Sequence, residues 1–231
     1  MIQKEIIKFK GSEINLNKIQ QKVFRDLFSG CRINFLLGAG FSCSLLKLLD
    51  NFETVMEDIR HFQPDSINER KLKVIAEAYA YWAFFNKSIF PITQDIDKQS
   101  EPFLTYSNFA LLLKKILLNR SNTTINKQIN IFTTNYDPIL EIVFDSNKDI
   151  LYNDGFEGRI NPYFCMDNYC KAIYRKSLYS EKKSEIPLVN IFKVHGSVTW
   201  NKVNIDNIQY INYKEKIQTF FNQFDICLAK T

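Results

Sequence analysis

The chain lacks any apolar run long enough to cross a membrane, and its first residues, MIQKEIIKFKG, contain no secretory leader. Its five cysteines are an odd number, and none of them has the paired C-x-x-C spacing of a zinc ribbon. Cys165 and Cys170 stand five positions apart. From these absences we expect a reduced, cytoplasmic protein that holds no metal and inserts into no membrane.

Internal repeats, low-complexity tracts and a strong charge imbalance are missing as well. Lys plus Arg number 30 against 25 Asp plus Glu, which is too small an excess to indicate nucleic-acid binding, and no nucleic-acid motif accompanies it. The densest basic stretch, Lys171 to Lys183, is interpreted as a solvated helix face or a partner surface. Among the functions considered for this chain, a nucleic-acid-binding scaffold is therefore ranked last.

What the sequence does contain is enough apolar material for a large core. Hydrophobic residues make up 45% of its 231 residues, with 20 Phe and 11 Tyr, so global disorder is excluded. The length fits one nucleotide-binding domain with an insertion. We expect a single domain over residues 1–231.

The hydrophobic periodicity predicts an α/β fold, a Rossmann-like parallel sheet with a helical insertion. Core strands are expected near 33–37, 129–133 and 188–194. Helices are expected at about 15–29 and 41–62, the second with a break around Asp50-Asn51. The insertion spans about 62–120, with a helix around Leu72–Ala83 and another behind a Ser107 cap. Between these two helices, Phe90 to Phe103 is expected to be a loop whose tip covers a pocket or meets a partner. Val198 to Ile211 alternates as a β-hairpin does.

Three short blocks follow the expected strands. The glycine block, Gly38-Ala39-Gly40-Phe41-Ser42, comes directly after the apolar run Ile33 to Leu37. If this glycine turn opens a helix, backbone N–H groups and the helix dipole can hold a dinucleotide pyrophosphate; the alternative is a tight turn that needed small residues. The asparagine block (Thr133–Asp137) and the histidine block (Lys193–Ser197) place polar groups after two further strands. Open parallel sheets bind ligands at such positions.

The sequences GAGFS, TTNYD and HGS, in this order, resemble the sirtuin family, and more closely its bacterial sirtuin-like branch of NAD-consuming defence proteins. Asp154-Gly155-Phe156 adds to the resemblance. It implies NAD as the substrate, with Gly38, Ala39, Gly40, Phe41 and Ser42 at the pyrophosphate. It also implies hydrolysis of NAD to nicotinamide and ADP-ribose during phage infection, controlled by an activating partner or a homo-oligomer.

The chain departs from sirtuin deacetylases in two respects. It lacks their four-cysteine zinc module, and no Gly-Ile-Pro-Asp-Phe-Arg-like segment follows the glycine block. Family members also continue well past the HG block into further strands, whereas this sequence ends at Thr231. We therefore expect a sirtuin-like domain that lacks its C-terminal, adenosine-binding strands or receives them from a partner.

Asn135 and His195 are the expected catalytic residues. Nicotinamide leaves a cationic pyridinium as a neutral molecule, so neither a general acid nor a Lewis acid is needed, and the ribose passes through an oxocarbenium-like state. The amide of Asn135 can contact ribose and water without adding charge. Imidazole titrates near neutral pH, which suits His195 as the base; the alternative is a histidine hydrogen-bonded at a strand end. His61 is interpreted as a packing residue.

Four further side chains have two interpretations each. Ser42 binds a phosphate oxygen or caps a helix, and Thr134 lines the ribose pocket or only ends the strand. Ser197 contacts ribose or stabilises a turn. Asp137 lies near nicotinamide, caps a helix ahead of Pro138, or does both.

The competing functions are a module that senses NAD or ADP-ribose without turnover, and an ADP-ribosyltransferase or deacylase that uses the same cleavage step. The absent zinc cysteines argue against the deacylase.

Overall fold

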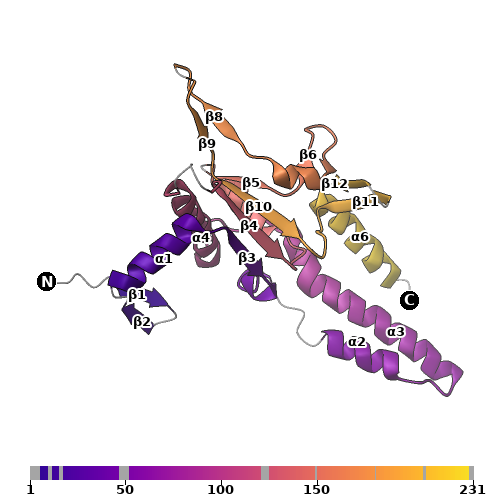
Figure 1. Cartoon of the computed structure of the whole chain (residues 1–231). Coiled ribbons are helices and arrows are strands. Elements are labelled where there is room, and N and C mark those ends of the chain that lie inside the picture. Colours follow the sequence, from indigo (N-terminus) through magenta and orange to yellow (C-terminus); the bar gives the residue numbers. More distant parts are fainter. Residues whose placement is uncertain are drawn as a thin grey trace.

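The computed structural model describes residues 6–9, 12–15, 18–46, 52–120, 125–148, 150–179, 181–204 and 207–228. Its centre is a parallel four-stranded sheet with the order β3-β4-β10-β5 (Figure 1). The strands are β3 (Ile33–Leu37), β4 (Gln128–Thr133), β10 (Leu188–Lys193) and β5 (Leu151–Asn153). The predicted α/β class with a Rossmann-like parallel sheet is confirmed.

The three strands that precede the sequence blocks end level with one another. Leu37 is the register partner of Thr133, and Thr133 is the partner of Lys193. The glycine, asparagine and histidine blocks therefore lie at the same, carboxyl edge of the sheet. This is the edge at which open parallel sheets bind ligands.

Two helices, α4 (Glu101–Leu118) and α5 (Ile139–Ser146), pack against the face of the sheet on which β4 is most buried. The cluster that they form with the sheet includes Leu113, Leu117, Ile129, Ile131, Val143 and Ile191, each at most 1% exposed. Because α4 begins at Glu101, Ser107 lies inside the helix and the predicted Ser107 cap is wrong. Pro102 fits the first turn, where its missing N–H leaves no bond unmade.

A buried arginine joins the opposite, amino edge of the sheet to the predicted N-terminal helix, α1 (Lys18–Gly30). The Arg120 guanidinium donates to the carbonyls of Phe28 at 3.2 Å, Cys31 at 2.8 Å, Asn126 at 3.2 Å and Gln128 at 3.0 Å. One side chain thus ties the end of α1 to the starts of β3 and β4.

The other face of the sheet carries a row of four asparagines, one on each strand. Asn130 is in register with Asn34 on β3 and with Asn190 on β10, and Asn190 is in register with Asn153 on β5. Their amides donate in sequence, from Asn153 to Asn190 at 3.1 Å, from Asn190 to Asn130 at 3.0 Å, and from Asn130 to Asn34 at 2.9 Å. Each amide thereby satisfies its neighbour.

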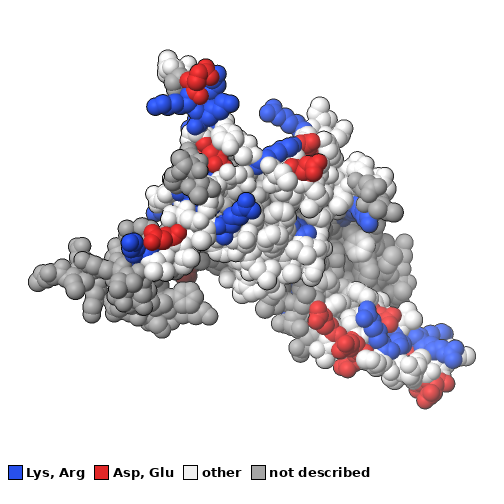
Figure 2. Space-filling model, viewed as in Figure 1, with Lys and Arg blue, Asp and Glu red and all other residues white. Residues whose placement is uncertain are grey.

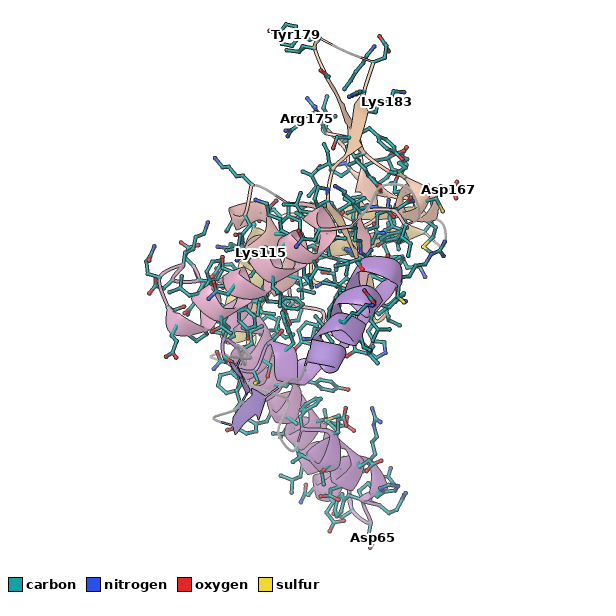
Figure 3. The ribbon with its side chains drawn as sticks, turned by 60° about the vertical axis from the view of Figure 1, so that its left-hand side comes forward. Asp65, Lys115, Asp167, Arg175, Tyr179 and Lys183 are labelled. Carbon is teal, nitrogen blue, oxygen red and sulfur yellow. The ribbon has the colours of Figure 1, made fainter. Side chains whose placement is uncertain are left out.

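A helical hairpin, α2 (Phe52–His61) and α3 (Ile67–Phe84), projects away from the sheet (Figure 1), and Asp65 lies at its far end (Figure 3). Ser66 and Glu69 form a capping box at the start of α3, and Lys73 Nζ donates to the carbonyls of Arg60 and Phe62 at the end of α2. The predicted helix over 41–62 is only half correct, because α2 begins at Phe52. The break predicted at Asp50-Asn51 lies outside the described residues.

Between α3 and α4 the chain forms a π-helical turn, Phe85–Ile89, and a 3₁₀ turn, Phe90–Thr93. The loop predicted over 90–103 is therefore confined to residues 94–100.

The chain after β5 forms two smaller sheets and a helix. The strands β6 (Phe156–Glu157), β7 (Tyr163–Phe164), β11 (Trp200–Asn204) and β12 (Asn207–Tyr210) make one sheet in the order β11-β12-β7-β6. Its β11–β12 pair confirms the hairpin predicted over 198–211. A 3₁₀ turn, Met166–Cys170, follows β7, and α6 spans Tyr213–Leu228. Near the N-terminus β1 (Ile6–Phe9) pairs with β2 (Ser12–Asn15).

The basic stretch is a hairpin of β8 (Tyr174–Lys176) and β9 (Lys183–Glu185), so its interpretation as a helix is wrong. Arg175, Tyr179 and Lys183 lie along this extension (Figure 3), and Lys and Arg gather at its end (Figure 2). Strand pairing satisfies its backbone without the apolar stripe that a helix would have to bury.

Candidate functional site

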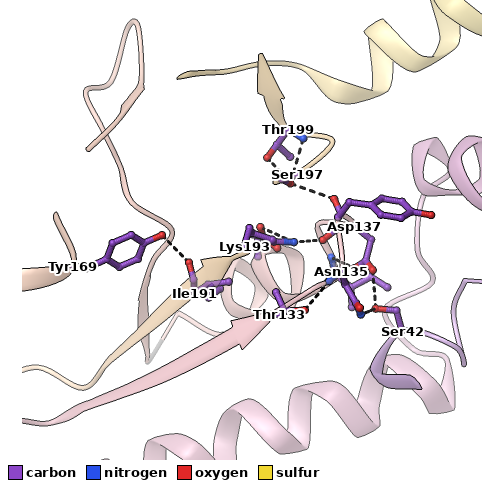
Figure 4. A network of polar contacts seen from close by, with 12 residues as sticks. Ser42, Thr133, Asn135, Asp137, Tyr169, Ile191, Lys193, Ser197 and Thr199 are labelled. Carbon is purple, nitrogen blue, oxygen red and sulfur yellow. Dashed lines mark hydrogen bonds and ion pairs between the residues drawn. The ribbon is translucent and has the colours of Figure 1, made fainter. Parts of the chain in front are cut away.

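The backbone joins the three blocks at the carboxyl edge of the sheet (Figure 4). The Thr134 amide donates to the Leu37 carbonyl at 3.3 Å, and the Val194 amide donates to the Thr133 carbonyl at 2.9 Å. One turn later, the Val198 amide donates to the Tyr136 carbonyl at 3.0 Å. Segments about a hundred and about sixty residues apart thus form one continuous surface.

Ser42, Asn135 and Asp137 form a buried polar network at the centre of this edge. The side-chain amide nitrogen of Asn135, Nδ2, donates to the Gly38 carbonyl at 3.0 Å and to Ser42 Oγ at 2.9 Å. The Ser42 hydroxyl in turn donates to Asp137 Oδ2 at 2.8 Å. Both amide protons of Asn135 are thereby committed to the protein, and its Oδ1 is the atom left to accept a bond from a ligand.

Asp137 holds both the glycine block and the start of α5. Its Oδ1 accepts from the Ile139 amide at 3.0 Å, while Oδ2 accepts from Ser42. The carboxylate therefore bonds the first amide of the helix, as predicted for a cap, although Pro138 occupies the N-cap position. Only 6% of Asp137 is exposed, so it supports the surface from below.

The glycine block does not open an α-helix as predicted. Residues Ala39–Phe41 form a 3₁₀ turn, followed by turns as far as Leu46. The Phe41 ring packs on Tyr106, whose hydroxyl donates to the Phe41 carbonyl, and Ser42 is fixed by Asp137. These anchors hold the block as a tight loop. A helix dipole is therefore not available at this block to bind an anion.

Neither glycine of the block is required by the loop itself. Gly38 has φ −108°, Gly40 is outside the left-handed region, and a Cβ at either position would meet nothing within 4 Å. The interpretation that a tight turn needed small residues there finds no support. Their missing side chains instead keep the surface above the sheet edge open.

The histidine block forms a turn tethered to the asparagine block. Gly196 has φ +83°, which favours glycine, and Ser197 Oγ donates to the Tyr136 carbonyl at 3.3 Å. Ser197 also accepts from the Thr199 hydroxyl at 2.9 Å, so its turn-stabilising role is visible. His195 is exposed on this turn, and Thr134 is exposed at the end of β4.

A buried ion pair supports the same surface. Lys193 Nζ lies 3.2 Å from Glu141 Oε1 and also donates to the Asp137 carbonyl. Burial raises the pKa of Glu141, and the Lys193 ammonium opposes that rise. Glu141 Oε2 is buried without a hydrogen-bond partner among the described residues. Lys193 thus fixes the asparagine block from beneath while neutralising a carboxylate.

We expect Lys193→Met to lower the free energy of unfolding by about 3–5 kcal/mol near pH 7, because it leaves Glu141 buried without its cation. The raised pKa of Glu141 should rise further in this variant. The native state then binds more protons than the unfolded state, so stability should increase as the pH falls toward the ordinary Glu value of about 4.3. Urea unfolding at about pH 7.5 and about pH 5.5 measures both effects.

The double variant Lys193→Met/Glu141→Gln is the matched control. It should recover part of the loss and no longer gain stability between the same two pH values. Equal pH dependence in the single and double variants would exclude Glu141 as the responsible group.

The Asp154-Gly155-Phe156 block forms a neighbouring turn. Asp154 Oδ1 accepts from the Phe156 amide at 3.1 Å, and Gly155 has φ +87°. A Cβ on Gly155 would approach Tyr169 Oη to 2.8 Å. Burial raises the pKa of Asp154, and the charge of Lys193 opposes this. The charge of Lys193 therefore opposes the rise in pKa of two carboxyl groups, those of Glu141 and Asp154.

An apolar cavity of 270 Å³ lies beside the polar network. Leu45, Leu46, Pro138 and Ile139 line it, together with the loop before α4, which agrees with the predicted placement of that loop over a pocket. Its volume is below the about 300–1,000 Å³ of whole-ligand sites, so it has room for one part of a dinucleotide. A cavity of 520 Å³ lies over the asparagine row, away from the carboxyl edge.

Sequence reasoning assigned no role to Thr133, Glu141 or Lys193. Thr133 is fully buried, and its hydroxyl accepts from the backbone amide of Asn135 at 3.0 Å. The one available signal was Lys193 itself, a cation that ends an apolar strand directly before the histidine turn. Its anionic partner lies on a helix 52 positions earlier, which periodicity does not reveal.

Comparison with known families matches residues 129–231 to the SIR2-like domain, a family that includes NAD-dependent enzymes. The matched part is similar to a sirtuin-like domain, contains Asn135 and His195, and indicates an NAD-related function. The glycine block lies before it. No curated protein matches the chain.

The described residues contain neither a metal-binding cluster nor a membrane-spanning helix. No group of three or more His, Cys, Asp or Glu side chains is placed to hold a metal ion. No helix in that part of the chain is both long and apolar enough to span a bilayer.

Proposed function

We propose that this chain is an NAD hydrolase that releases nicotinamide and ADP-ribose. The observation that carries the proposal is the convergence of the three blocks at one sheet edge, where both side-chain amide protons of Asn135 are bonded within the protein and its Oδ1 is left to accept from a ligand. The SIR2-like match over 129–231 supports NAD as the substrate.

Asn135 and the glycine block would hold the substrate. The amide oxygen of Asn135 accepts a bond from a ribose hydroxyl or from the attacking water, and stabilises positive charge as the ribose flattens. Gly38, Ala39 and Gly40 allow the backbone to approach the pyrophosphate. Phe41 and Ser42 act through the loop, because the ring packs in the core and the hydroxyl proton is bound by Asp137.

His195 would act as the base. The bond between nicotinamide and ribose breaks with its electron pair going to the pyridine nitrogen, so nicotinamide leaves neutral. Water attacks the ribose carbon, and His195 removes its proton. Thr134 and Ser197, on the same edge, are proposed to contact ribose, and Asp137 to shape the nicotinamide end from beneath. No step requires a metal.

The test is chromatography of NAD incubated with the purified full chain, alone and with any co-purifying protein. Nicotinamide and ADP-ribose in equal amounts support hydrolysis. Binding of NAD without release indicates a sensing module, and ADP-ribose attached to protein indicates a transferase.

We expect Gly40→Val to weaken NAD binding at least about tenfold without lowering the melting temperature. The added side chain meets no protein atom but occupies the approach to the pyrophosphate. Calorimetry and thermal unfolding measure the two quantities. Gly155→Ala is the contrasting variant, since its strained φ and its contact with Tyr169 should lower stability instead. Unchanged NAD affinity in Gly40→Val would remove the glycine block from the site.

The biological setting follows from the same resemblance. We propose a single cytoplasmic domain whose NAD consumption serves antiphage defence, and whose activity depends on an activating partner or on self-assembly. The helical insertion is a proposed part of that domain.

A further inference from the structure

Helix α3 presents a broad apolar surface to solvent on the side that faces away from α2. Its inner side faces α2, with Ala80 buried and Phe84 stacked on Phe52 at 4.6 Å. Its outer side presents five large apolar residues that are 62–73% exposed: Ile67, Leu72, Val74, Ile75 and Tyr79. Contiguous exposed apolar patches of this kind mark interaction sites. The outer side of α3 is therefore an unpaired surface in a single chain.

Lys71, one turn from both Ile67 and Ile75, is exposed within this surface, and two further charged residues border it on one edge. Arg70 and Glu77 are seven positions apart, two helical turns, and so lie one above the other. Neither is joined by an ion pair to another described residue. Figure 2 shows acidic side chains on the hairpin near the body of the molecule and again at its tip, with Lys and Arg between them.

A cavity lies at the C-terminal end of α3 on this surface, and an exposed apolar side chain that can fill such a cavity lies at its N-terminal end. The cavity has a volume of 430 Å³ and is lined by Ala78, Tyr81, Trp82, Phe84, Phe85 and Phe220. At the opposite end of α3, Ile67 is 73% exposed. The 18 residues of α3 separate the two ends by about 27 Å.

We propose that α3 is the interface with a second copy of this chain, in which the two α3 helices pack antiparallel about a two-fold axis between Val74 and Ile75. This arrangement places Ile67 of each copy opposite Trp82 of the other, at the cavity. It also places Arg70 of each copy beside Glu77 of the other, because like edges face each other in an antiparallel pair. One surface thus contains both halves of each contact, as a two-fold interface requires.

The occupant is a second copy rather than another protein because the patch is complementary to itself. Antiparallel pairing satisfies two charge pairs and fills two cavities with residues of the same helix. The inference concerns assembly alone and is independent of NAD turnover.

The test is sedimentation of the full chain over a range of concentrations, with charge-reversal variants. The wild type should form dimers or larger even-numbered assemblies. Arg70→Glu and Glu77→Arg should each raise the dissociation constant at least about tenfold, because each change turns two symmetry-related attractions into repulsions. The double variant Arg70→Glu/Glu77→Arg should associate within about threefold of the wild type, because the pairs are restored with their signs exchanged.

Arg159→Glu, an exposed charge reversal on the loop after β6, is the matched control and should leave association unchanged. Circular dichroism should show the same helix content in all variants, since Arg70 is exposed and Glu77 is partly exposed. A wild type that stays monomeric, single variants that associate normally, or a double variant that does not recover would each overturn the proposed interface.

Discussion

His195→Ala is expected to lower the rate of nicotinamide release from NAD at least about a hundredfold, the range for a lost general base. The imidazole is exposed on the turn after β10, so its removal should leave the melting temperature within about a degree or two. The loss should be in kcat rather than in KM, because the proposed base acts on water and not on NAD.

The chain supplies its own control, because its other histidine lies elsewhere. His61 is the last residue of α2, on the projecting hairpin, and is also exposed. His61→Ala should cleave NAD at the wild-type rate. Near-normal turnover by folded His195→Ala would exclude the imidazole from the chemical step.

Asn135→Ala is expected to lower the same rate at least about a hundredfold for a different reason. The variant loses the amide oxygen proposed to bind ribose or water, and it also frees the Gly38 carbonyl and Ser42 Oγ from the bonds that fix the glycine block. We therefore expect both a lower kcat and weaker NAD binding. Unlike His195→Ala, it should also lower the free energy of unfolding, by about 1–3 kcal/mol.

Asn135→Asp removes the donated bonds while keeping an acceptor oxygen, and so separates the two losses in Asn135→Ala. The aspartate retains an acceptor oxygen but cannot donate to Gly38 or Ser42, and it places a second carboxylate beside Asp137. It should be as inactive as Asn135→Ala. Asn119→Ala, which removes an exposed amide at the end of α4, is the control for loss of an asparagine. Wild-type turnover by folded Asn135→Asp would show that the donated bonds are unnecessary.

The sequence was most informative where a short apolar run ended in a polar block. The strands expected at 33–37, 129–133 and 188–194 correspond to β3, β4 and β10 within one residue at each end. Buried parallel strands read as continuous apolar runs, so their positions are visible without knowledge of their partners. The meeting of the three blocks then followed from parallel pairing alone.

Long-range contacts were not visible in the same way. The glycine block was expected to start a helix, but Tyr106 and Asp137, from other elements, hold it as a 3₁₀ turn. The basic stretch was expected to be helical, but pairing of Arg175 with Ser184 makes it a hairpin. In the first case the deciding contacts lie outside the window in which periodicity is read, and in the second the pairing of two short strands overrides the local pattern.

The asparagine row gives the sheet a direction that its backbone alone does not define. At β5 the Asn153 side chain accepts from the Gly155 amide at 3.0 Å and donates to the Asn168 carbonyl at 2.9 Å, and backbone groups cannot exchange these roles. These two bonds fix the orientation of the Asn153 side-chain amide, and each neighbouring amide then takes the same orientation. The dipoles therefore align and reinforce one another from β5 to β3. At the far end of the row, the Asn34 side chain accepts with its oxygen and has its NH₂ group left to donate. This orientation is set by the turn at Gly155, three strands away.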